Sequence, residues 1–582
     1  MAIGQRSLTP TRIEGVASRI GRRPLDTFAV VATIVGFGVA LLITYPIVRV
    51  VLRVVRVDGQ WDASALTDAF RQPGFVQVLL NTSILAVSST VIALIVGGIL
   101  AWILERTDAR MGPLGRAMPL LPFLLPPAAG AVGWVLAGSD RSGLVNASLR
   151  SVLARVGIQM ETGPISIYSW FGLIAVTSLY CVPFTYLTIS AGLQSMDTSL
   201  EEQSRICGLG PVRTFVRVTL PSMKPSAGAG MLLALWVSIS MFSVPAIIGG
   251  QAGIEVLSVR VIRLLTRTYP AETGAALGLS AIVLVVLASV WGLQRRMLKG
   301  SHHASISGKS ARHDLIRLGR FRWLARAVVL GYLLVAVVVP FTCLAIVALN
   351  GFWTTSIAWS DLSLDAFGDA FSDRLTRDAL TNSLRLGFGG GLLAVLIAAM
   401  IVARSERSAS RSVRSLVGFI KLPMAVSSIV VGVGIILAYG GSPFGLQQTS
   451  IILLIGYLTL CVPQASVAVE AGYSQIGKEL IEAGHVSGAR EGRVFGRLIL
   501  PLMMPMLVAA WAMAFARIVE DLTIAALLSG SNNPVIGMRL LDAFHTGTYA
   551  QVAALAIMLT AVSSVVVIGM LAVSSRIQGA RR

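Results

Sequence analysis

One segment of the chain occurs twice, and the two copies define how the molecule is organised. Residues 181–225 read CVPFTYLTISAGLQSMDTSLEEQSRICGLGPVRTFVRVTLPSMKP, and residues 461–505 read CVPQASVAVEAGYSQIGKELIEAGHVSGAREGRVFGRLILPLMMP. At a constant offset of 280 residues, 15 of the 45 positions are identical without a gap. The matches include Glu, Gly, Arg and Pro in a polar stretch, which a shared apolar composition does not produce. We therefore interpret the chain as an internal duplication.

The segments around both copies are long, apolar and free of charge. Of 582 residues, 55% are hydrophobic and 13% are charged, which is about half the charged fraction of an ordinary soluble domain. Several uncharged runs exceed the roughly 20 residues that cross a bilayer as a helix; among them are 27–48, 73–104, 162–196, 225–254, 273–294 and 327–360. This composition excludes a soluble protein and predicts an all-α polytopic membrane protein that contacts lipid.

Breaking the longest runs at clusters of Gly, Pro and Ser gives about twelve transmembrane helices. The predicted ranges are 27–49, 77–104, 117–138, 167–195, 226–249, 273–294, 327–349, 384–403, 415–439, 450–472, 505–529 and 551–575. The loops and tails on one side carry 33 of the 48 Lys and Arg residues, so the positive-inside rule makes this side, with both termini, cytoplasmic. Because the basic residues behind the net charge of +20 lie in short loops between spans, we expect no nucleic-acid partner.

The duplication divides these helices into two halves of six, at 27–294 and 327–575. An even number of spans gives both halves the same orientation, so they form a parallel repeat related by an axis along the membrane normal. Outside the halves we expect a basic cytoplasmic tail at 1–26, a basic cytoplasmic linker at 295–326 and a short cytoplasmic tail at 576–582.

Each copy of the repeat contains a polar loop on the predicted cytoplasmic side, at 200–221 and 480–501. Both loops have a Glu, a Gly six residues later and a Leu-Pro pair; these are Glu202, Gly208, Leu220 and Pro221 in the first loop, and Glu482, Gly488, Leu500 and Pro501 in the second. This pattern resembles the signature loop of binding-protein-dependent (type I) ABC importer permeases, which reads Glu-Ala-Ala, three residues, Gly, nine residues, Ile-x-Leu-Pro. The first copy departs from it at Gln203-Ser204, and the second at Gly484.

The resemblance implies the type I ABC importer permease fold, with two six-helix halves fused in one chain. It implies that the eight loop residues couple the membrane helices to two ABC ATPase subunits on the cytoplasmic face. It also implies an external solute-binding protein and a multi-pass location in a bacterial cytoplasmic (inner) membrane. Because the chain has no Gly-x-x-x-x-Gly-Lys-[Ser/Thr] motif, we expect no cofactor and no catalytic residue in this chain, with ATP used by the partner subunit.

A second motif bears on the solute. Glu105-Arg106-Thr107-Asp108 is followed by Gly112, Arg116 and a proline-rich span at 119–127, and this stretch resembles the iron(III) and thiamine branch of the family. That branch often carries both halves on one polypeptide. The resemblance therefore favours ferric iron as the imported solute, with thiamine, 2-aminoethylphosphonate and polyamines as alternatives.

A secondary transporter of the major facilitator type is the alternative from another class, since it also has two parallel halves and cytoplasmic termini. Its hallmark is a Gly-x-x-x-Asp-Arg-x-Gly-Arg-Arg loop after the second span. The loop at 105–116 has Asp108-Ala109-Arg110 instead, with Leu104 in place of the Gly. The hallmark matches poorly, and we favour the importer.

Three charged residues, Arg517, Glu520 and Asp521, fall within the predicted eleventh span. A charge at the centre of a membrane helix costs roughly 2.5–3.5 kcal/mol on insertion scales, so such groups face protein or water. Arg517 and Asp521 share a helix face at i,i+4 spacing, which favours a structural ion pair. Glu520 is the better candidate for the substrate path. We group these three residues with Ser243 of the first half as candidate path residues, and we assign no metal site.

Overall fold

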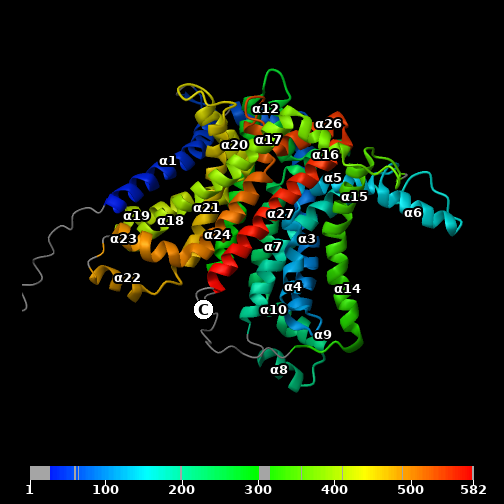
Figure 1. The fold of residues 1–582 in the computed structure, drawn as a ribbon, viewed down its shortest axis with the longest axis horizontal. Helices are drawn as coiled ribbons and strands as arrows, with labels where there is room; N and C mark the ends of the chain where they lie inside the picture. The colour runs from blue at the N-terminus through cyan, green and yellow to red at the C-terminus, as the bar shows by residue number, and fades with distance from the viewer. Residues whose placement is uncertain are drawn as a thin grey trace, which may run out of the picture.

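The computed structural model describes residues 27–57, 60–62, 64–196, 199–299, 315–355, 357–408, 410–487, 489 and 491–579. Long helices dominate this part of the chain, which confirms the predicted all-α class (Figure 1). A helix satisfies its own backbone hydrogen bonds, as an apolar environment requires. A short antiparallel hairpin of β1 (Arg56–Val57) and β2 (Gln60–Trp61) follows the first helix.

The first half begins with α1 (Thr27–Val55) and ends with α13 (Thr273–Lys299). The elements between them are α2 (Ser64–Arg71), α3 (Phe75–Arg106), α4 (Gly112–Ala117), η2 (Met118–Leu124), α5 (Pro127–Gly138), α6 (Leu144–Arg155), α7 (Trp170–Ser195), α8 (Ser199–Ile206), α9 (Pro211–Thr214), η3 (Phe215–Thr219), α10 (Leu220–Ser222), α11 (Lys224–Ser240), η4 (Pro245–Gly249) and α12 (Leu257–Thr266).

The described elements after residue 314 run from η5 (Gly319–Phe321), within the predicted linker, to α27 (Tyr549–Gly579). The elements between them are α14 (Arg322–Leu333), η6 (Leu334–Val338), α15 (Val339–Asn350), α16 (Asp365–Ser372), α17 (Arg374–Arg385), η7 (Leu386–Gly390), α18 (Gly391–Arg407), α19 (Arg411–Ile420), η8 (Leu422–Ala425), α20 (Ser428–Ile435), η9 (Ile436–Gly440), α21 (Ser450–Tyr473), α22 (Lys478–Val486), α23 (Glu491–Val494), η10 (Phe495–Ile499), α24 (Leu500–Val519), α25 (Thr523–Leu528) and α26 (Ile536–Thr546).

Nine helical segments of the described residues are long and apolar enough to cross a membrane, and two bent pairs raise this number to 11. The bent pairs are Gly112–Leu124 with Pro127–Gly138, at 88°, and Arg411–Ala425 with Ser428–Gly440, at 106°. The first bend lies at Leu125, which is extended because a proline follows it. The remaining predicted span corresponds to α11, which has 17 residues.

Two predicted spans are interrupted where the sequence indicated continuous helices. The prediction of 226–249 is broken after Ser240, where α11 ends, and Met241 is extended. The prediction of 505–529 is broken after Val519, where α24 ends, and a new helix starts at Thr523. At the offset of 280 the two breaks coincide within one residue, so the interruption belongs to the repeat.

The first long helix of each half packs against the opposite half. Helix α1 contacts α18, α19 and α20, whereas α15 contacts α5 of the first half and α27. In Figure 1, α1 (blue) accordingly lies beside the yellow-green helices, and α14 (green) lies on the side of α3. The two halves are therefore interlocked by an exchange of their first helices.

A glycine permits the closest approach in each exchanged contact. A Cβ atom on Gly434 of α20 would lie 2.7 Å from the Pro46 carbonyl oxygen of α1. A Cβ atom on Gly133 of α5 would lie 2.5 Å from the Pro340 carbonyl oxygen of α15. Both distances are too short for a side chain, so the exchange depends on glycine at both positions.

Helices α8 and α22 lie well apart at the ends of their halves, whereas α12 and α26 lie together at the opposite end of the molecule (Figure 1). The halves thus converge at one end and diverge at the other. Both polar loops of the repeat lie on the diverging end.

Candidate coupling loops and translocation site

The first polar loop forms the short helix α8, which ends in a glycine turn. Gly208 has φ +82°, in the left-handed region that favours glycine. The Cys207 amide donates to the Gln203 carbonyl at 3.0 Å, and the Leu209 amide donates to the Ser204 carbonyl at 3.1 Å. The first bond is the last i to i−4 bond of the helix, and the second is the 6→1 bond of a Schellman C-cap, with Gly208 at the position where the motif prefers glycine. The Glu202 side chain is exposed on this helix.

The second polar loop repeats this construction. Helix α22 carries Glu482, whose side chain is also exposed. The Ser487 amide donates to the Ala483 carbonyl at 3.0 Å, and the Ala489 amide donates to the Gly484 carbonyl at 3.2 Å. Both bonds match those of the first loop at the offset of 280. Gly488 lies outside the described residues.

The Leu-Pro pairs stand where each loop enters the next long helix. Leu220 and Pro221 begin α10, and Leu500 and Pro501 begin α24. A π-helical turn precedes each pair, η3 in the first half and η10 in the second. The widened π-helical turn therefore lies where the proline, which has no amide hydrogen, interrupts the α-helical hydrogen bonds.

The motif that resembles the iron and thiamine branch is held together by a buried carboxylate. Glu105 accepts hydrogen bonds from Ser190 Oγ at 2.8 Å and from Gln194 Nε2 at 3.0 Å. Its second oxygen forms an ion pair with Arg116 at 2.9 Å. These contacts fix the end of α3 on the end of α7, next to the first polar loop.

Sequence reasoning missed Glu201, the residue before Glu202. Its side chain is 5% exposed, accepts a hydrogen bond from Thr219 Oγ1 at 2.6 Å and lies 3.7 Å from Arg106 Nε. The available signal was the pair of adjacent acids in the first copy, since the second copy has Ile481 at the matching position.

The candidate path residues lie around the break between α24 and α25. Arg517 Nη1 is 3.6 Å from Asp521 Oδ1, and the other Asp521 oxygen accepts a hydrogen bond from the Ile524 amide at 2.7 Å. Asp521 is therefore held in place at the start of α25. Glu520 is the C-cap residue of α24, and its amide donates to the Ala516 carbonyl at 2.9 Å. Ser243 is buried at the matching break of the first half.

A cavity of about 420 Å³ lies between the halves at the converging end. Both α12 and α26 line it, with Arg263, Arg267 and His545 among the lining residues. Glu255 forms ion pairs with Arg260 at 2.8 Å and with Arg263 at 3.0 Å. Burial and the nearby Arg267 lower the pKa of His545. The charged residues of the lining are therefore two arginines and one glutamate, and His545 favours its neutral form.

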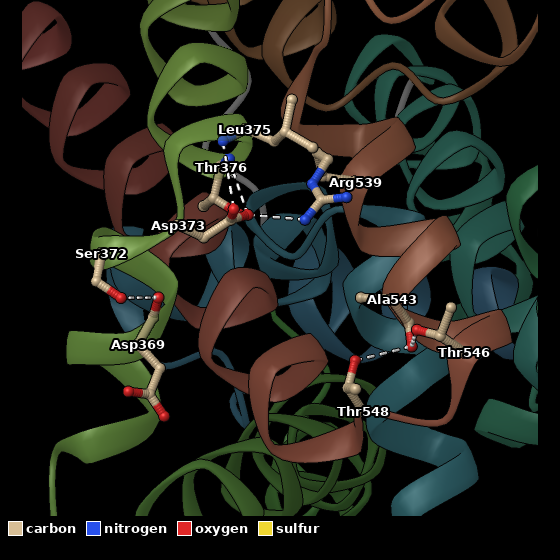
Figure 2. A network of polar contacts seen from close by, with 9 residues as sticks. All are labelled: Asp369, Ser372, Asp373, Leu375, Thr376, Arg539, Ala543, Thr546 and Thr548. Atoms are coloured by element: carbon tan, nitrogen blue, oxygen red, sulfur yellow. Dashed lines mark hydrogen bonds and ion pairs between the residues drawn. The ribbon is translucent and has the colours of Figure 1, made fainter.

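An ion pair between Arg539 and Asp373 attaches helix α26 to α17 of the same half (Figure 2). Asp373 caps the start of α17, accepting hydrogen bonds from Leu375 N, Thr376 N and Thr376 Oγ1. Arg539 of α26 donates to the same carboxylate at 2.8 Å. The hydrogen bonds from Thr376 and the Arg539 guanidinium hold the pKa of Asp373 below its ordinary value, against the opposing effect of desolvation. Among the described residues, no cluster of three His, Cys, Asp or Glu side chains could hold a metal ion.

Comparisons with known proteins cover nearly the whole chain. The family model described as binding-protein-dependent transport system inner membrane component matches residues 15–300 and 390–579. The Fe(3+)-transport system permease protein FbpB 2 of Haemophilus influenzae is 24% identical over 550 residues, covering 94% of this chain and 97% of the relative. The ferric transport system permease protein FbpB of Actinobacillus pleuropneumoniae is 23% identical over 517 residues, covering 87% and 72%. Among solved structures, a chain of a bacterial alginate ABC transporter in complex with an alginate-bound periplasmic protein has a TM-score of 0.37 at 20% identity, covering 44% of this chain and 96% of that chain.

Proposed function

Because the chain belongs to the family of binding-protein-dependent transport system inner membrane components, we propose that it is the fused permease subunit of an ABC importer for ferric iron. The observation that carries the importer role is the pair of exposed helices α8 and α22, which occur at a fixed offset and end in the same hydrogen-bonded turn. The major facilitator alternative is a different family without this repeated loop.

The ferric assignment is supported by two relatives that are named as ferric transport permeases and that align along most of this chain. The resemblance of the segment beginning at Glu105 points to the same branch. Thiamine, 2-aminoethylphosphonate and polyamines remain the alternative solutes.

The partners follow from this role. We expect two ATPase subunits to bind α8 and α22 through the residues around Glu202 and Glu482, and an external solute-binding protein to deliver the ion at the other end. ATP would be used by the ATPase subunits rather than by this chain. The chain is a multi-pass membrane protein of the inner membrane, and we propose that both termini are cytoplasmic.

Transport would proceed by alternating access of the two halves. The halves diverge where α8 and α22 lie and converge at α12 and α26 (Figure 1), which is the arrangement expected when the route is open toward the cytoplasm. Closure of the ATPase subunits would draw α8 and α22 together and open the converging end. The solute would then enter between the halves from the binding protein.

The proposed route passes the helix breaks at the centre of the molecule. A break in a helix exposes backbone N–H and C=O groups that an unbroken membrane helix keeps in its own hydrogen bonds. We propose that Glu520 and Ser243 line this route, and that Arg517 and Asp521 stabilise its wall as an ion pair.

The test is uptake of radiolabelled iron(III) in cells that lack this gene, with and without the gene restored. Uptake that requires both the gene and cellular ATP would support the ferric importer. If the protein is inserted in the membrane at a normal level and iron uptake does not change, the ferric assignment is wrong. The same assay with thiamine, 2-aminoethylphosphonate and spermidine would then identify the solute.

A further inference from the structure

The first coupling helix contains a buried acid that faces the membrane domain. Glu202 is exposed, whereas the Glu201 side chain is 5% exposed and lies between α8 and the elements α3 and η3. Its Oε1 atom accepts the Thr219 hydroxyl of η3 at 2.6 Å and lies 3.7 Å from Arg106 Nε at the end of α3. One carboxylate therefore connects three separate elements.

Arg106 extends this connection to two further parts of the chain. Its side chain is 4% exposed, and Nη2 donates to the Leu193 carbonyl at the end of α7 at 3.0 Å. Its backbone carbonyl accepts from the Ile316 amide at 2.9 Å, in the segment that leads into the second half. Asp108 Oδ1 accepts from the Leu318 amide at 3.1 Å, which strengthens the same attachment.

The second half replaces the polar contact with an apolar one. At the offset of 280, Glu201 corresponds to Ile481 and Thr219 corresponds to Ile499. Both isoleucines are buried in one hydrophobic cluster with Val494 and Phe495. The two halves therefore differ at both positions, with an acid and a hydroxyl in the first and a pair of isoleucines in the second.

The polar contact of Glu201 and the apolar contact of Ile481 restrain their helices differently. A buried ion pair is stable only in the geometry that keeps both charges paired, because either charge alone in the interior is strongly unfavourable. An apolar contact has no such directional requirement. The first coupling helix is thus held by a directional polar contact to α3 and η3, whereas α22 has an apolar contact at the matching position.

We propose that Glu201 is the positioning residue of the first coupling loop, which transmits movement of α8 to α3, η3 and the start of the second half through Thr219 and Arg106. The two coupling loops are consequently unequal, with the first rigidly linked and the second more compliant. This inference rests on the proposed role of α8 and α22 as the sites that the ATPase subunits move.

The test uses the full chain reconstituted in proteoliposomes with its ATPase subunits and with binding protein loaded with iron(III). ATP hydrolysis and iron import are measured together for wild type and for Glu201→Gln, which keeps the shape and removes the charge. We expect iron imported per ATP hydrolysed to fall by roughly 5-fold or more, the lower range of coupling between distant sites. The milder variant Thr219→Val should change the ratio in the same direction, and Glu161→Gln, an exposed carboxylate in a distant loop, should leave it unchanged.

A second measurement needs no cargo and separates this inference from the proposed function. Amide hydrogen exchange of the membrane-embedded chain should become faster in 199–206 with Glu201→Gln, while exchange in 478–486 stays the same. Wild type that hydrolyses ATP without importing iron would contradict the ferric importer, and the exchange result would still decide the role of Glu201. Unchanged exchange in 199–206, or a wild-type ratio of import to hydrolysis in Glu201→Gln, would overturn the inference.

Discussion

Gly208 closes the first coupling helix in a backbone conformation that other residues adopt only at a cost. Its φ of +82° would cost an L-residue roughly 1–2 kcal/mol, and a Cβ atom there would meet nothing within 4 Å. We expect Gly208→Ala to speed amide exchange in α8 by roughly 5- to 30-fold and to reduce iron uptake. Gly210→Ala is the matched control, because Gly210 also has open space but no positive φ. If both variants exchange alike, the backbone turn is not what holds the helix end.

Asp373 combines a helix cap with an ion pair at the converging end (Figure 2). Removing a capping carboxylate destabilises a protein by about 0.5–2 kcal/mol, so Asp373→Ala should lower the thermal unfolding midpoint, and Asp373→Asn should lower it less. Asp369→Ala is the control, because the Asp369 carboxylate is exposed and points away from this network. An equal loss in Asp369→Ala would rule out the capping explanation.

The same residue gives a pH dependence with a defined sign. The pKa of Asp373 in the folded protein lies below its ordinary value of 3.8. Its stabilising contribution is therefore present above pH 3.8 and is lost as the pH falls through the lower, folded-state pKa. The difference in unfolding midpoint between wild type and Asp373→Asn should persist from neutral pH to about pH 4 and shrink below it. A difference that grows on acidification would contradict this assignment.

At the scale of elements, the exchanged helices depend on two glycine contacts. A Cβ atom at Gly133 would lie 2.5 Å from the Pro340 carbonyl oxygen, so Gly133→Ala forces α5 and α15 apart. Overpacking of this kind costs about 1–3 kcal/mol, and the thermal unfolding midpoint should fall accordingly. Gly331→Ala, in the same exchanged segment but with nothing within 4 Å of its Cβ position, should leave the midpoint unchanged or raise it. A stable Gly133→Ala variant would indicate that the exchange is loosely packed.

The coupling helices allow a test that leaves folding intact. Glu482 is exposed on α22, so Glu482→Lys should change stability little while reversing the charge presented to the proposed ATPase partner. We expect iron uptake to be abolished at a normal level of membrane-inserted protein. Asp361→Lys, an equal charge reversal at an exposed position in another loop, is the control. Normal uptake in Glu482→Lys would contradict the coupling role of this loop.

The helices and their duplication could be predicted from the sequence because both depend on residues that are close together in the chain. Uniform apolar runs indicate membrane helices, and matched Glu, Gly and Pro residues reveal the repeat. An apolar run does not indicate which other helices it will contact, so the packing of α1 against the opposite half was not predictable. The break after Ser240 was missed because no charge interrupts the apolar run there, and the break after Val519 was missed because Glu520 and Asp521 were interpreted as charges within a continuous span. The burial of Glu201 was missed because its partner Arg106 lies 95 positions earlier in the chain.

At the scale of the whole molecule, the two halves meet at the centre of the proposed route. The break in the first half has Ser240 where the second half has Glu520, so only the second half contributes a carboxylate. This carboxylate is adjacent in sequence to Asp521, which pairs with Arg517. A ferric ion is a hard cation and prefers oxygen ligands, so a single acid at the junction of the halves suits transient passage rather than tight retention.

We therefore expect Glu520→Gln to slow iron uptake while the amount of protein and its thermal unfolding midpoint stay close to wild type. Gln has nearly the shape of Glu but removes the charge that a passing cation would meet. Glu470→Gln is the matched control, because Glu470 pairs with Lys421 away from the junction, and its loss should leave the uptake rate unchanged. ATP hydrolysis measured in the same reconstituted complex would separate a slower passage step from lost coupling. Unchanged uptake in Glu520→Gln would assign Glu520 to packing between the halves and move the route elsewhere.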